Sequence, residues 1–312
     1  MGLLKSVREE VEKVIVGQPV LLERVLLAIL SGGHILIEGV PGLAKTRTVR
    51  TFAQVLGGSW QRVQFTPDLV PSDLVGTRMW LPGEGRFDFE PGPVHTNFLL
   101  ADEINRAPAK VQSALLEAME ERQVTIARET VRLPDPFLVL ATQNPQESEG
   151  TYPLPEAQTD RFMFRVTLEY PSDSEELEVL RRHIVGSAEP TPVMRIEDLL
   201  LARTAAASVY VPRSVADAIV HLVASTRTDH QRASVAEFIL TGAGPRASLA
   251  LVTAARSRAF LHGRSEVALG DVTDLAVDVL SHRLTLSHKA HLQGRSQRDI
   301  ARIVLEESGL LG

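Results

Sequence analysis

The sequence predicts an α/β domain with a five-stranded, mainly parallel sheet, followed by an all-α domain. Up to residue 172, short apolar runs rich in β-branched residues alternate with helical segments, which is typical of a parallel sheet covered on both faces. From Ser174 to Leu311, strand signals are absent and Ala-, Leu- and Arg-rich helical segments fill most of the chain. We therefore expect an α/β core over 1–172 and a helical domain over 173–312, with 173–192 as a connecting helix and linker.

The elements of the core are predicted from local patterns. Apolar, β-branched runs predict strands, helical spacing of apolar residues predicts helices, and alternation around a Pro-Gly turn predicts hairpins. Pro19 stands at the first turn of its helix, where a missing N–H costs nothing. The predicted strands are 34–38, 60–65, 98–101, 137–141 and 162–166, the helices are 3–14, 19–30, 44–56 and 108–122, and two hairpin inserts are 76–93 and 123–133.

The composition of the chain excludes several classes of protein. The chain has 312 residues, of which 44% are hydrophobic and 23% are charged, so it can bury a large core. It has no cysteine, which excludes disulfides and thiolate metal sites and fits a cytoplasmic location. The N-terminus does not have the pattern of a signal peptide, and no apolar run is long enough to span a membrane. The net charge of -6 argues against nucleic acid as a partner.

A glycine-containing turn follows the first predicted strand, with the sequence Gly39-Val40-Pro41-Gly42-Leu43-Ala44-Lys45-Thr46. In a phosphate-binding loop, backbone N–H groups converge on the anion, a lysine contacts the β and γ phosphates, and a hydroxyl binds magnesium. Lys45 and Thr46 occupy the last two of these positions. The alternative is an ordinary strand-to-helix turn with a solvated lysine. Ala44 stands where the usual pattern has glycine, which alanine can replace if it already has helical dihedral angles.

The predicted strand at 98–101 ends in a pair of carboxylates, Asp102 and Glu103. Parallel sheets bind ligands at the carboxyl ends of their strands, so this pair is expected beside the phosphates. Asp102 would bind Mg²⁺, and Glu103 could orient or deprotonate an attacking water. Taken alone, such a pair is more often a helix N-cap. Together with the loop, it predicts a site for ATP and Mg²⁺.

At this point the sequence resembles the AAA+ ATPases, and among them the MoxR family. The resemblance covers nearly the whole chain, and the alanine before Lys45 is itself similar to the MoxR form of the loop. The motifs that carry it are Ile15-Val16-Gly17-Gln18, the loop at 39–46, Ala101-Asp102-Glu103-Ile104-Asn105-Arg106-Ala107-Pro108, Leu115-Leu116-Glu117-Ala118-Met119-Glu120-Glu121, Ala141-Thr142-Gln143-Asn144-Pro145, Asp160-Arg161-Phe162 and Gly244-Pro245-Arg246-Ala247.

The resemblance implies roles for five further residues. Asn144 matches a sensor that helps to place the attacking water, although an asparagine before proline also suits a turn. Arg161 matches an arginine finger donated to the γ phosphate of a neighbouring subunit. A surface salt bridge of Arg161 with the adjacent aspartate is the alternative. Arg246 matches the second sensor, a nucleotide contact carried on the helical lid, and Gly17 and Gln18 match the segment beside adenine, or form a plain turn between helices.

Both hairpins also resemble family features that face the central pore of related rings. Trp80, Phe87 and Phe89 in the first hairpin could therefore contact a partner, or could simply pair across the two-stranded ribbon. Near the C-terminus, His282, His288 and His291 have no acidic partner at metal-ligand spacing, so we expect solvated histidines.

The resemblance implies an ATPase that assembles into a ring, expected to be a hexamer, and remodels or activates protein partners. It implies a chaperone-like role beside proteins with von Willebrand factor A domains, in metal-cofactor insertion or in complex assembly. Two other classes stay open on the residues alone. One is a nucleic-acid-dependent AAA+ motor, which the negative net charge disfavours. The other is a nucleotide-switched scaffold, which the intact set of catalytic residue types disfavours.

Overall fold

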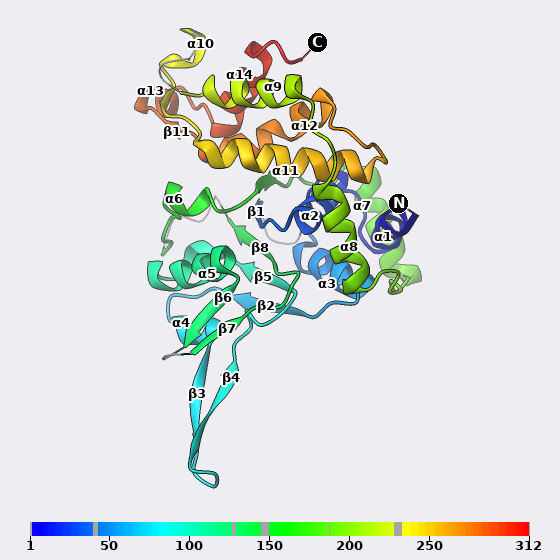
Figure 1. The fold of residues 1–312 in the computed structure, drawn as a ribbon, viewed down its shortest axis with the longest axis vertical. Coiled ribbons are helices and arrows are strands. Elements are labelled where there is room, and N and C mark those ends of the chain that lie inside the picture. Colours follow the sequence, from blue (N-terminus) through cyan, green and yellow to red (C-terminus); the bar gives the residue numbers. More distant parts are fainter. Residues whose placement is uncertain are drawn as a thin grey trace.

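A five-stranded parallel sheet forms the centre of the N-terminal half of the protein, as the sequence predicted (Figure 1). The computed structural model describes residues 2–39, 43–126, 129–144, 150–186, 188–227 and 233–311. The strands lie in the order β2-β5-β8-β1-β9. Their bounds are β1 (Ile35–Glu38), β2 (Trp60–Gln64), β5 (Phe98–Asp102), β8 (Leu138–Gln143) and β9 (Phe164–Thr167). All four neighbouring pairs run parallel, so the five carboxyl ends share one edge of the sheet.

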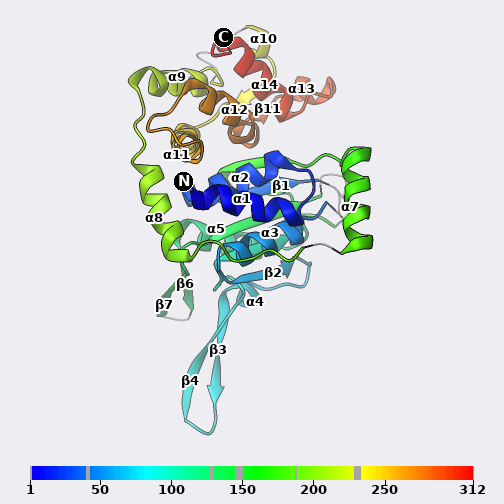
Figure 2. The ribbon, with the colours of Figure 1, turned by 90° about the vertical axis from the view of Figure 1, so that its right-hand side faces the viewer.

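Helices cover both faces of this sheet, which explains why its central strands β1, β5 and β8 are almost continuously apolar. Ile35 and Ile37 are completely buried in one hydrophobic cluster with helices on one face, and Leu36 is completely buried in a second cluster on the other. The first face carries α1 (Gly2–Val14), α2 (Pro19–Ser31) and α3 (Lys45–Val55), and the second carries α4 (Pro71–Val75) and α5 (Ala109–Glu121) (Figure 2). A short 3-10 helix, η1 (Ile104–Arg106), leads from β5 into α5.

Two hairpins extend from the core at the positions predicted. The longer one pairs β3 (Gly76–Leu81) with β4 (Arg86–Pro91) and projects away from the rest of the molecule, and the shorter one pairs β6 (Gln123–Ile126) with β7 (Glu129–Arg132) (Figure 1). Trp80 and Phe87 pair across the long ribbon with ring centroids 5.0 Å apart. The cross-strand pairing is thus present, yet Trp80 and Phe87 remain 51% and 57% exposed.

The C-terminal half is mainly helical, and we call its elements from α9 to α14 the lid. The lid contains α9 (Arg213–Ala224), α10 (Ala233–Ala236), α11 (Pro245–Leu261), α12 (Leu269–Leu280), η3 (Ser281–Arg283), α13 (His288–Leu292) and α14 (Gln297–Glu307). It also contains an antiparallel pair, β10 (Ile239–Thr241) with β11 (Thr285–Leu286), which sequence periodicity did not indicate because strands of three and two residues are too short to show alternation.

Among the described residues, three further helices lie between β8 and the lid in the sequence. In chain order they are α6 (Glu156–Thr159), α7 (Asp173–Val185) and α8 (Ile196–Ala207). Helix α8 packs against both α2 of the core and α11 of the lid. The division of the chain at residue 172 therefore remains a prediction. Within the ranges that the structure describes, no helix is long and apolar enough to cross a membrane.

One of the contacts between the lid and the core is made by η3. His282 is 2% exposed, and its Nε2 lies 2.9 Å from the backbone oxygen of Phe162. Arg283 donates from Nε to Asp160 Oδ1 at 2.8 Å and from Nη2 to the Phe162 oxygen at 2.7 Å. The expectation of a solvated His282 was therefore wrong. His282 lies in η3, which follows α12 and packs against the core. Burial sets the pKa of His282 well below its ordinary value.

A second buried histidine, His34, lies directly before β1 and contacts the backbone of β8 and α5. Its Nδ1 accepts a hydrogen bond from the Val139 amide at 3.0 Å, and its Nε2 lies 3.2 Å from the backbone oxygen of Met119. Complete burial, reinforced by the positive charge of Arg122, lowers the pKa of His34 to about 3. The folded protein therefore keeps this imidazole neutral, since the Val139 amide needs Nδ1 as an acceptor.

The buried His34 predicts a specific loss of stability in mild acid. The unfolded chain takes up a proton near pH 6.5, whereas the folded chain does so only near pH 3, so stability falls as the pH drops from 6.5 towards 3. Between pH 7.5 and 5.0 the contribution of His34 is expected to fall by about 2 kcal/mol, at 1.36 kcal/mol for each pH unit below 6.5. Urea unfolding at both pH values should show a smaller pH-dependent loss in His34→Gln than in the wild type; equal losses would contradict the assignment.

Candidate active site

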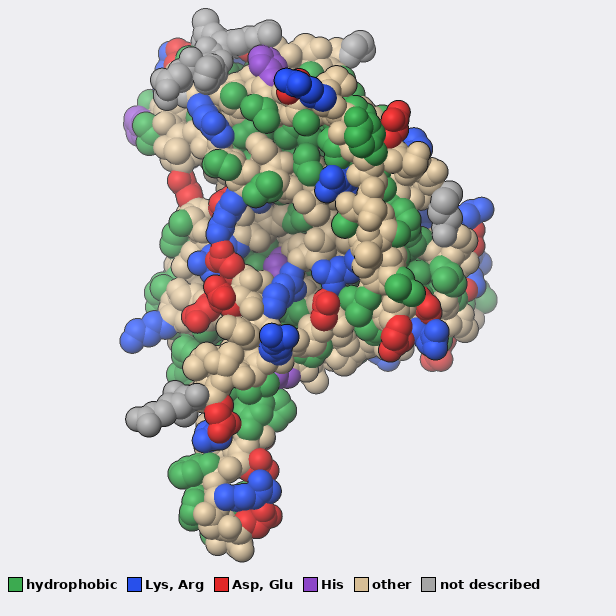
Figure 3. Space-filling model, viewed as in Figure 1, with side chains coloured by type: hydrophobic (Ala, Val, Ile, Leu, Met, Phe, Trp, Pro, Cys, Tyr) green, Lys and Arg blue, Asp and Glu red, His purple; other side chains and the backbone are tan. Residues whose placement is uncertain are grey.

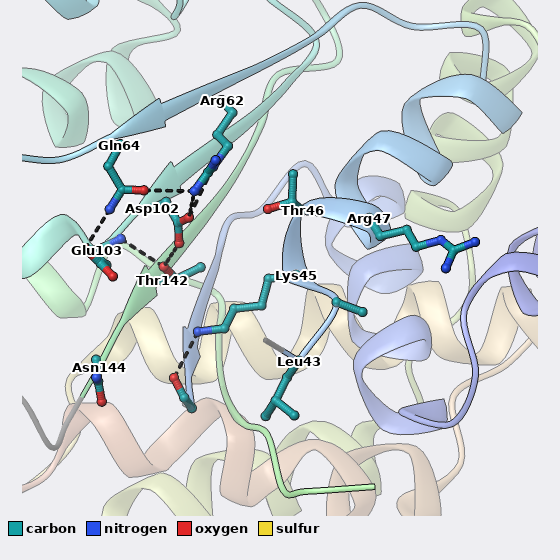
Figure 4. Close-up of a pocket in the computed structure, with 12 residues that line it drawn as sticks. Leu43, Lys45, Thr46, Arg47, Arg62, Gln64, Asp102, Glu103, Thr142 and Asn144 are labelled. Carbon is teal, nitrogen blue, oxygen red and sulfur yellow. Dashed lines mark hydrogen bonds and ion pairs between the residues drawn. The ribbon is translucent and has the colours of Figure 1, made fainter. Parts of the chain in front are cut away.

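A cavity of about 390 Å³ lies at the carboxyl edge of the sheet, between the loop after β1 and the ends of β2, β5 and β8 (Figure 4). It brings together every described residue of the predicted loop, the acidic pair and the predicted sensor asparagine. The residues that line it are Gly39, Leu43, Ala44, Lys45, Thr46, Arg47, Arg62, Gln64, Asp102, Glu103, Thr142 and Asn144. The predicted contacts at Val40, Pro41 and Gly42 lie outside the described residues.

The side chain of Lys45 lines the cavity, near the carboxylates of Asp102 and Glu103. Its Nζ donates a hydrogen bond to the backbone oxygen of Gly39 at 2.9 Å. Partial burial lowers the pKa of Lys45, and the nearby charges of Asp102 and Glu103 oppose this shift. The site thus holds a half-buried ammonium at the start of a helix, where an anionic ligand is favoured by both the charge and the helix N-terminus.

Ala44 does not have the helical dihedral angles that the sequence interpretation assumed. Its φ is 55° and its ψ is 17°, in the left-handed region, and the helix begins only at Lys45. Ala44 therefore makes a sharp backbone turn directly before the helix. The left-handed conformation costs an L-residue about 1–2 kcal/mol, which explains why the general pattern has glycine here.

Asp102 holds a position between a cation and a hydroxyl. Its Oδ2 accepts hydrogen bonds from Arg62 Nη2 at 2.7 Å and Nε at 3.2 Å, and its Oδ1 accepts one from Thr142 Oγ1 at 2.6 Å. The side chain of Arg62 is 46% exposed and can therefore move aside. The Thr46 hydroxyl and the Asp102 carboxylate line the same cavity, and both supply the hard oxygen ligands that Mg²⁺ prefers, so the residues fit this ion.

Glu103 has a backbone conformation that is rare for its residue type, with φ 57° and ψ 49°. Its amide donates to Thr142 Oγ1 at 2.9 Å, and its Oε2 accepts from Gln64 Nε2 at 2.6 Å and Arg106 Nη1 at 2.9 Å. Glu103 precedes η1, but its side chain makes no capping hydrogen bond. The N-cap interpretation is therefore excluded for this carboxylate, and the strained backbone instead turns Glu103 into the cavity (Figure 4).

Sequence reasoning missed four residues that line this site, namely Arg47, Arg62, Gln64 and Thr142. Arg62 and Gln64 alternate along β2, and Gln64 lies directly opposite Asp102 in the register of β2 with β5. Polar residues at alternate positions of a strand were a visible signal. The strand order was not, because β2 and β5 are separated in sequence by a helix and a hairpin, and their contact becomes evident only in the folded sheet.

The segment predicted to lie beside adenine is a turn between α1 and α2. Gly17 and Gln18 both have positive φ, at 67° and 59°. Gln18 Nε2 donates to the backbone oxygen of Glu169 at 3.1 Å, and neither residue lines the cavity around Lys45. The backbone of Gly17 and Gln18 therefore forms the interhelical turn that was the alternative interpretation. Their contact with adenine stays a prediction.

The two predicted arginines, Arg161 and Arg246, lie away from the Lys45 cavity. They line a separate cavity of about 280 Å³ between the core and the lid. Arg161 Nη2 lies 3.2 Å from Glu120 Oε2, and Arg246 forms an ion pair with the other oxygen of Glu120. The predicted salt bridge of Arg161 with Asp160 is not present, because Asp160 pairs with Arg283. The second-sensor arginine is therefore not placed on the nucleotide site of its own chain.

The parallel sheet, the loop after β1 and the carboxylates after β5 define a P-loop nucleotide-binding fold with a helical lid. Comparisons with known proteins specify the family. A model described as "ATPase family associated with various cellular activities (AAA)" matches residues 34–164, and an AAA lid domain model matches residues 231–303. The chain is 52% identical over 283 residues to Chaperone MoxR1 of Mycobacterium tuberculosis, covering 90% of this chain and 75% of that protein.

Further similarities extend over almost the full length. The chain is 43% identical over 307 residues to the uncharacterized protein YeaC of Bacillus subtilis, covering 97% of this chain and 93% of that one. The crystal structure of a candidate ATPase from Cytophaga hutchinsonii superposes with a TM-score of 0.91 at 46% identity, covering 98% of this chain and 94% of that one. The chain belongs to the MoxR family of AAA+ ATPases.

Proposed function

We propose that this chain binds ATP with Mg²⁺ in the Lys45 cavity and hydrolyses it there. The observation that carries the proposal is the convergence of Lys45, Thr46, Asp102, Glu103 and Asn144 on one cavity at the carboxyl edge of the sheet. These are the groups that phosphoryl transfer to water needs: a cation for the phosphates, oxygen ligands for a metal ion, and a carboxylate near the attacking water.

Each residue has a distinct role in the proposed reaction. Lys45 binds the β and γ phosphates, and the N-terminus of α3 adds favourable partial charge. Thr46 and Asp102 would hold Mg²⁺, which neutralises negative charge on the phosphates when bound. Glu103 accepts a proton from water or orients it, and Asn144 helps to place this water. Gln64 and Arg106 hold the Glu103 carboxylate in position.

Lys45→Ala tests the nucleotide site directly. The variant is expected to bind ATP at least tenfold more weakly and to show no measurable phosphate release, because it removes the cation from a half-buried anion site. Calorimetric titration with a non-hydrolysable ATP analogue, paired with a phosphate-release assay, measures both effects. Lys110→Ala, at an exposed lysine on α5, is the matched control and should behave like the wild type. Unchanged affinity in Lys45→Ala would contradict the proposal.

The position of Arg161 and Arg246 supports assembly into a ring, which we propose to be a hexamer. Both arginines are remote from the Lys45 cavity of their own chain, while both flank a cleft on the surface where lid and core meet. A head-to-tail interface that closes into a ring places such a surface against the nucleotide site of the next copy. In this arrangement both guanidiniums reach the γ phosphate of the neighbouring subunit.

The proposed output is remodelling or activation of a protein client in the cytoplasm. The long hairpin supports this role, because β3 and β4 project away from the body of the protein and carry the half-exposed side chains of Trp80 and Phe87 (Figure 1). The relative named Chaperone MoxR1 favours chaperone-like work. We propose as clients proteins with von Willebrand factor A domains, with metal-cofactor insertion or complex assembly as the process served.

A further inference from the structure

Glu120 connects the core to the lid through two arginines. It lies in the last turn of α5 and uses both carboxylate oxygens, Oε2 for Arg161 and Oε1 for Arg246. Arg161 belongs to the core, in the segment between α6 and β9, whereas Arg246 belongs to the first turn of α11 in the lid. Figure 3 shows acidic and basic side chains gathered where the lid meets the core on this face.

Without Glu120, two guanidiniums in this cleft would repel each other. Arg246 Nη1 also lies 3.8 Å from Asp160 Oδ2, but Asp160 already accepts a hydrogen bond at 2.8 Å from the buried Arg283. Glu120 is therefore the carboxylate that pairs with both arginines at once, and its single negative charge offsets half of their combined positive charge. Because it contacts each of them through a separate oxygen, it also fixes how far apart they lie.

The same ion pairs contribute little to folding stability. The side chains of Glu120, Arg161 and Arg246 are 36%, 31% and 50% exposed, and ion pairs at such exposed positions are screened by water and salt. The lid is held on the core by other contacts, including those of His282 and Arg283 with the backbone of Phe162. Glu120 would thus stabilise the fold only weakly. Its contacts can, however, set the positions of the two arginines.

We propose that Glu120 is a positioning residue that holds Arg161 and Arg246 as one pair, aligned for the nucleotide of the adjacent subunit. This inference rests on the proposed action of the arginines across the subunit interface. Because one member of the pair lies on the lid, movement of the lid in one subunit changes the arginine pair that the next subunit receives. Glu120 therefore links the state of one site to the rate at the next.

Glu120→Gln tests the proposal through kcat and KM. The substitution keeps the shape of the side chain but removes its charge, and misplacing catalytic groups by about 1 Å can cost up to about 100-fold in rate. We expect kcat to fall roughly 10- to 100-fold with KM for ATP nearly unchanged, and Glu120→Asp to recover part of the loss because it restores the charge. The control is Glu121→Gln, which removes the same charge from the next, exposed residue of α5 and should keep the wild-type rate.

Mixed assemblies show whether Glu120 acts on the neighbouring site. Subunits with Lys45→Ala have no functional site of their own, but they still offer their arginines to wild-type neighbours. Adding Glu120→Gln to these subunits should lower ATP turnover of the mixture, whereas adding Glu121→Gln should not. If Glu120→Gln leaves the rate unchanged while Arg161→Ala lowers it in the same background, the proposed role of Glu120 is overturned. The proposed trans action of the arginines then still stands. An unchanged rate with Arg161→Ala as well overturns the proposed trans action of the arginines. Thermal unfolding and sedimentation of each variant confirm that folding and assembly are intact.

Discussion

Glu103→Gln is expected to lower ATP turnover at least about 100-fold while ATP affinity stays within a factor of two of the wild type, because positioned general bases contribute roughly 10²- to 10⁴-fold. The amide fills the same space and still accepts a hydrogen bond from Gln64, but it cannot take a proton from water. Lys45, proposed to bind the phosphates, and Thr46, proposed to bind Mg²⁺, are unchanged in this variant. Single-turnover phosphate release and equilibrium binding of labelled ATP separate the two effects.

The same variant captures the client if the remodelling role is correct. A subunit that binds ATP without hydrolysing it stays in the ATP state, so a protein engaged in that state should co-purify with Glu103→Gln and be released on exchange to ADP. Glu117→Gln, on an exposed position of α5 outside the Lys45 cavity, is the control for loss of one acidic charge. Turnover at the wild-type rate in Glu103→Gln would show that another group activates the water.

The sheet was predictable because most of its strands have a strong local signal, which is weakest in the polar edge strand β2. Ile35 and Ile37 pack on one face and Leu36 on the other, and a strand that is buried on both faces must be apolar throughout. The parallel arrangement followed from the alternation of strands with helices. The lid pair β10 and β11 was missed, since pairing of Ile239 with Leu286 links residues far apart in sequence and leaves no local pattern.

The residues that line the candidate site were predictable where they form contiguous sequence motifs. The loop residues and the Asp102-Glu103 pair are contiguous motifs, and the rule that parallel strands end at one edge brings them together. Gln64 and Thr142 were not predicted, because their roles depend on strand order. The conformation of Ala44 was predicted incorrectly, since residue type favoured a right-handed backbone while the geometry of the loop demands a left-handed one.

Glu120 could not have been singled out from the sequence. It lies among several acidic residues at the end of α5, and only the fold places it within reach of Arg161, 41 positions on, and Arg246, 126 positions on. The same fold separates Arg161 and Arg246 from the Lys45 cavity of their own chain. That separation is the physical reason why we propose that the two arginines act on the site of another subunit.

Arg161→Ala is expected to lower kcat about 1,000-fold, the lower range for loss of an arginine that stabilises charge on a transferring phosphoryl group. The affinity of each subunit for ATP should persist, because Arg161 does not line the cavity in which we propose that the nucleotide binds. Arg302→Ala, at an exposed arginine on α14, provides the control and should retain wild-type kcat. Steady-state kinetics over a range of ATP and protein concentrations measures this effect, and a change confined to KM would contradict it.

Mixing two inactive variants decides whether Arg161 acts within its own chain or on the next. A subunit with Arg161→Ala keeps an intact Lys45 cavity, and a subunit with Lys45→Ala keeps an intact Arg161. In a ring with head-to-tail contacts, about a quarter of the interfaces in an equal mixture join an intact cavity to an intact arginine, so activity should reappear. If Arg161 served the cavity of its own chain, no combination would rebuild a complete site and the mixture would stay inactive. Recovery of turnover on mixing therefore requires a site that is shared between subunits. The same mixed assemblies can be used to measure how this turnover depends on Glu120.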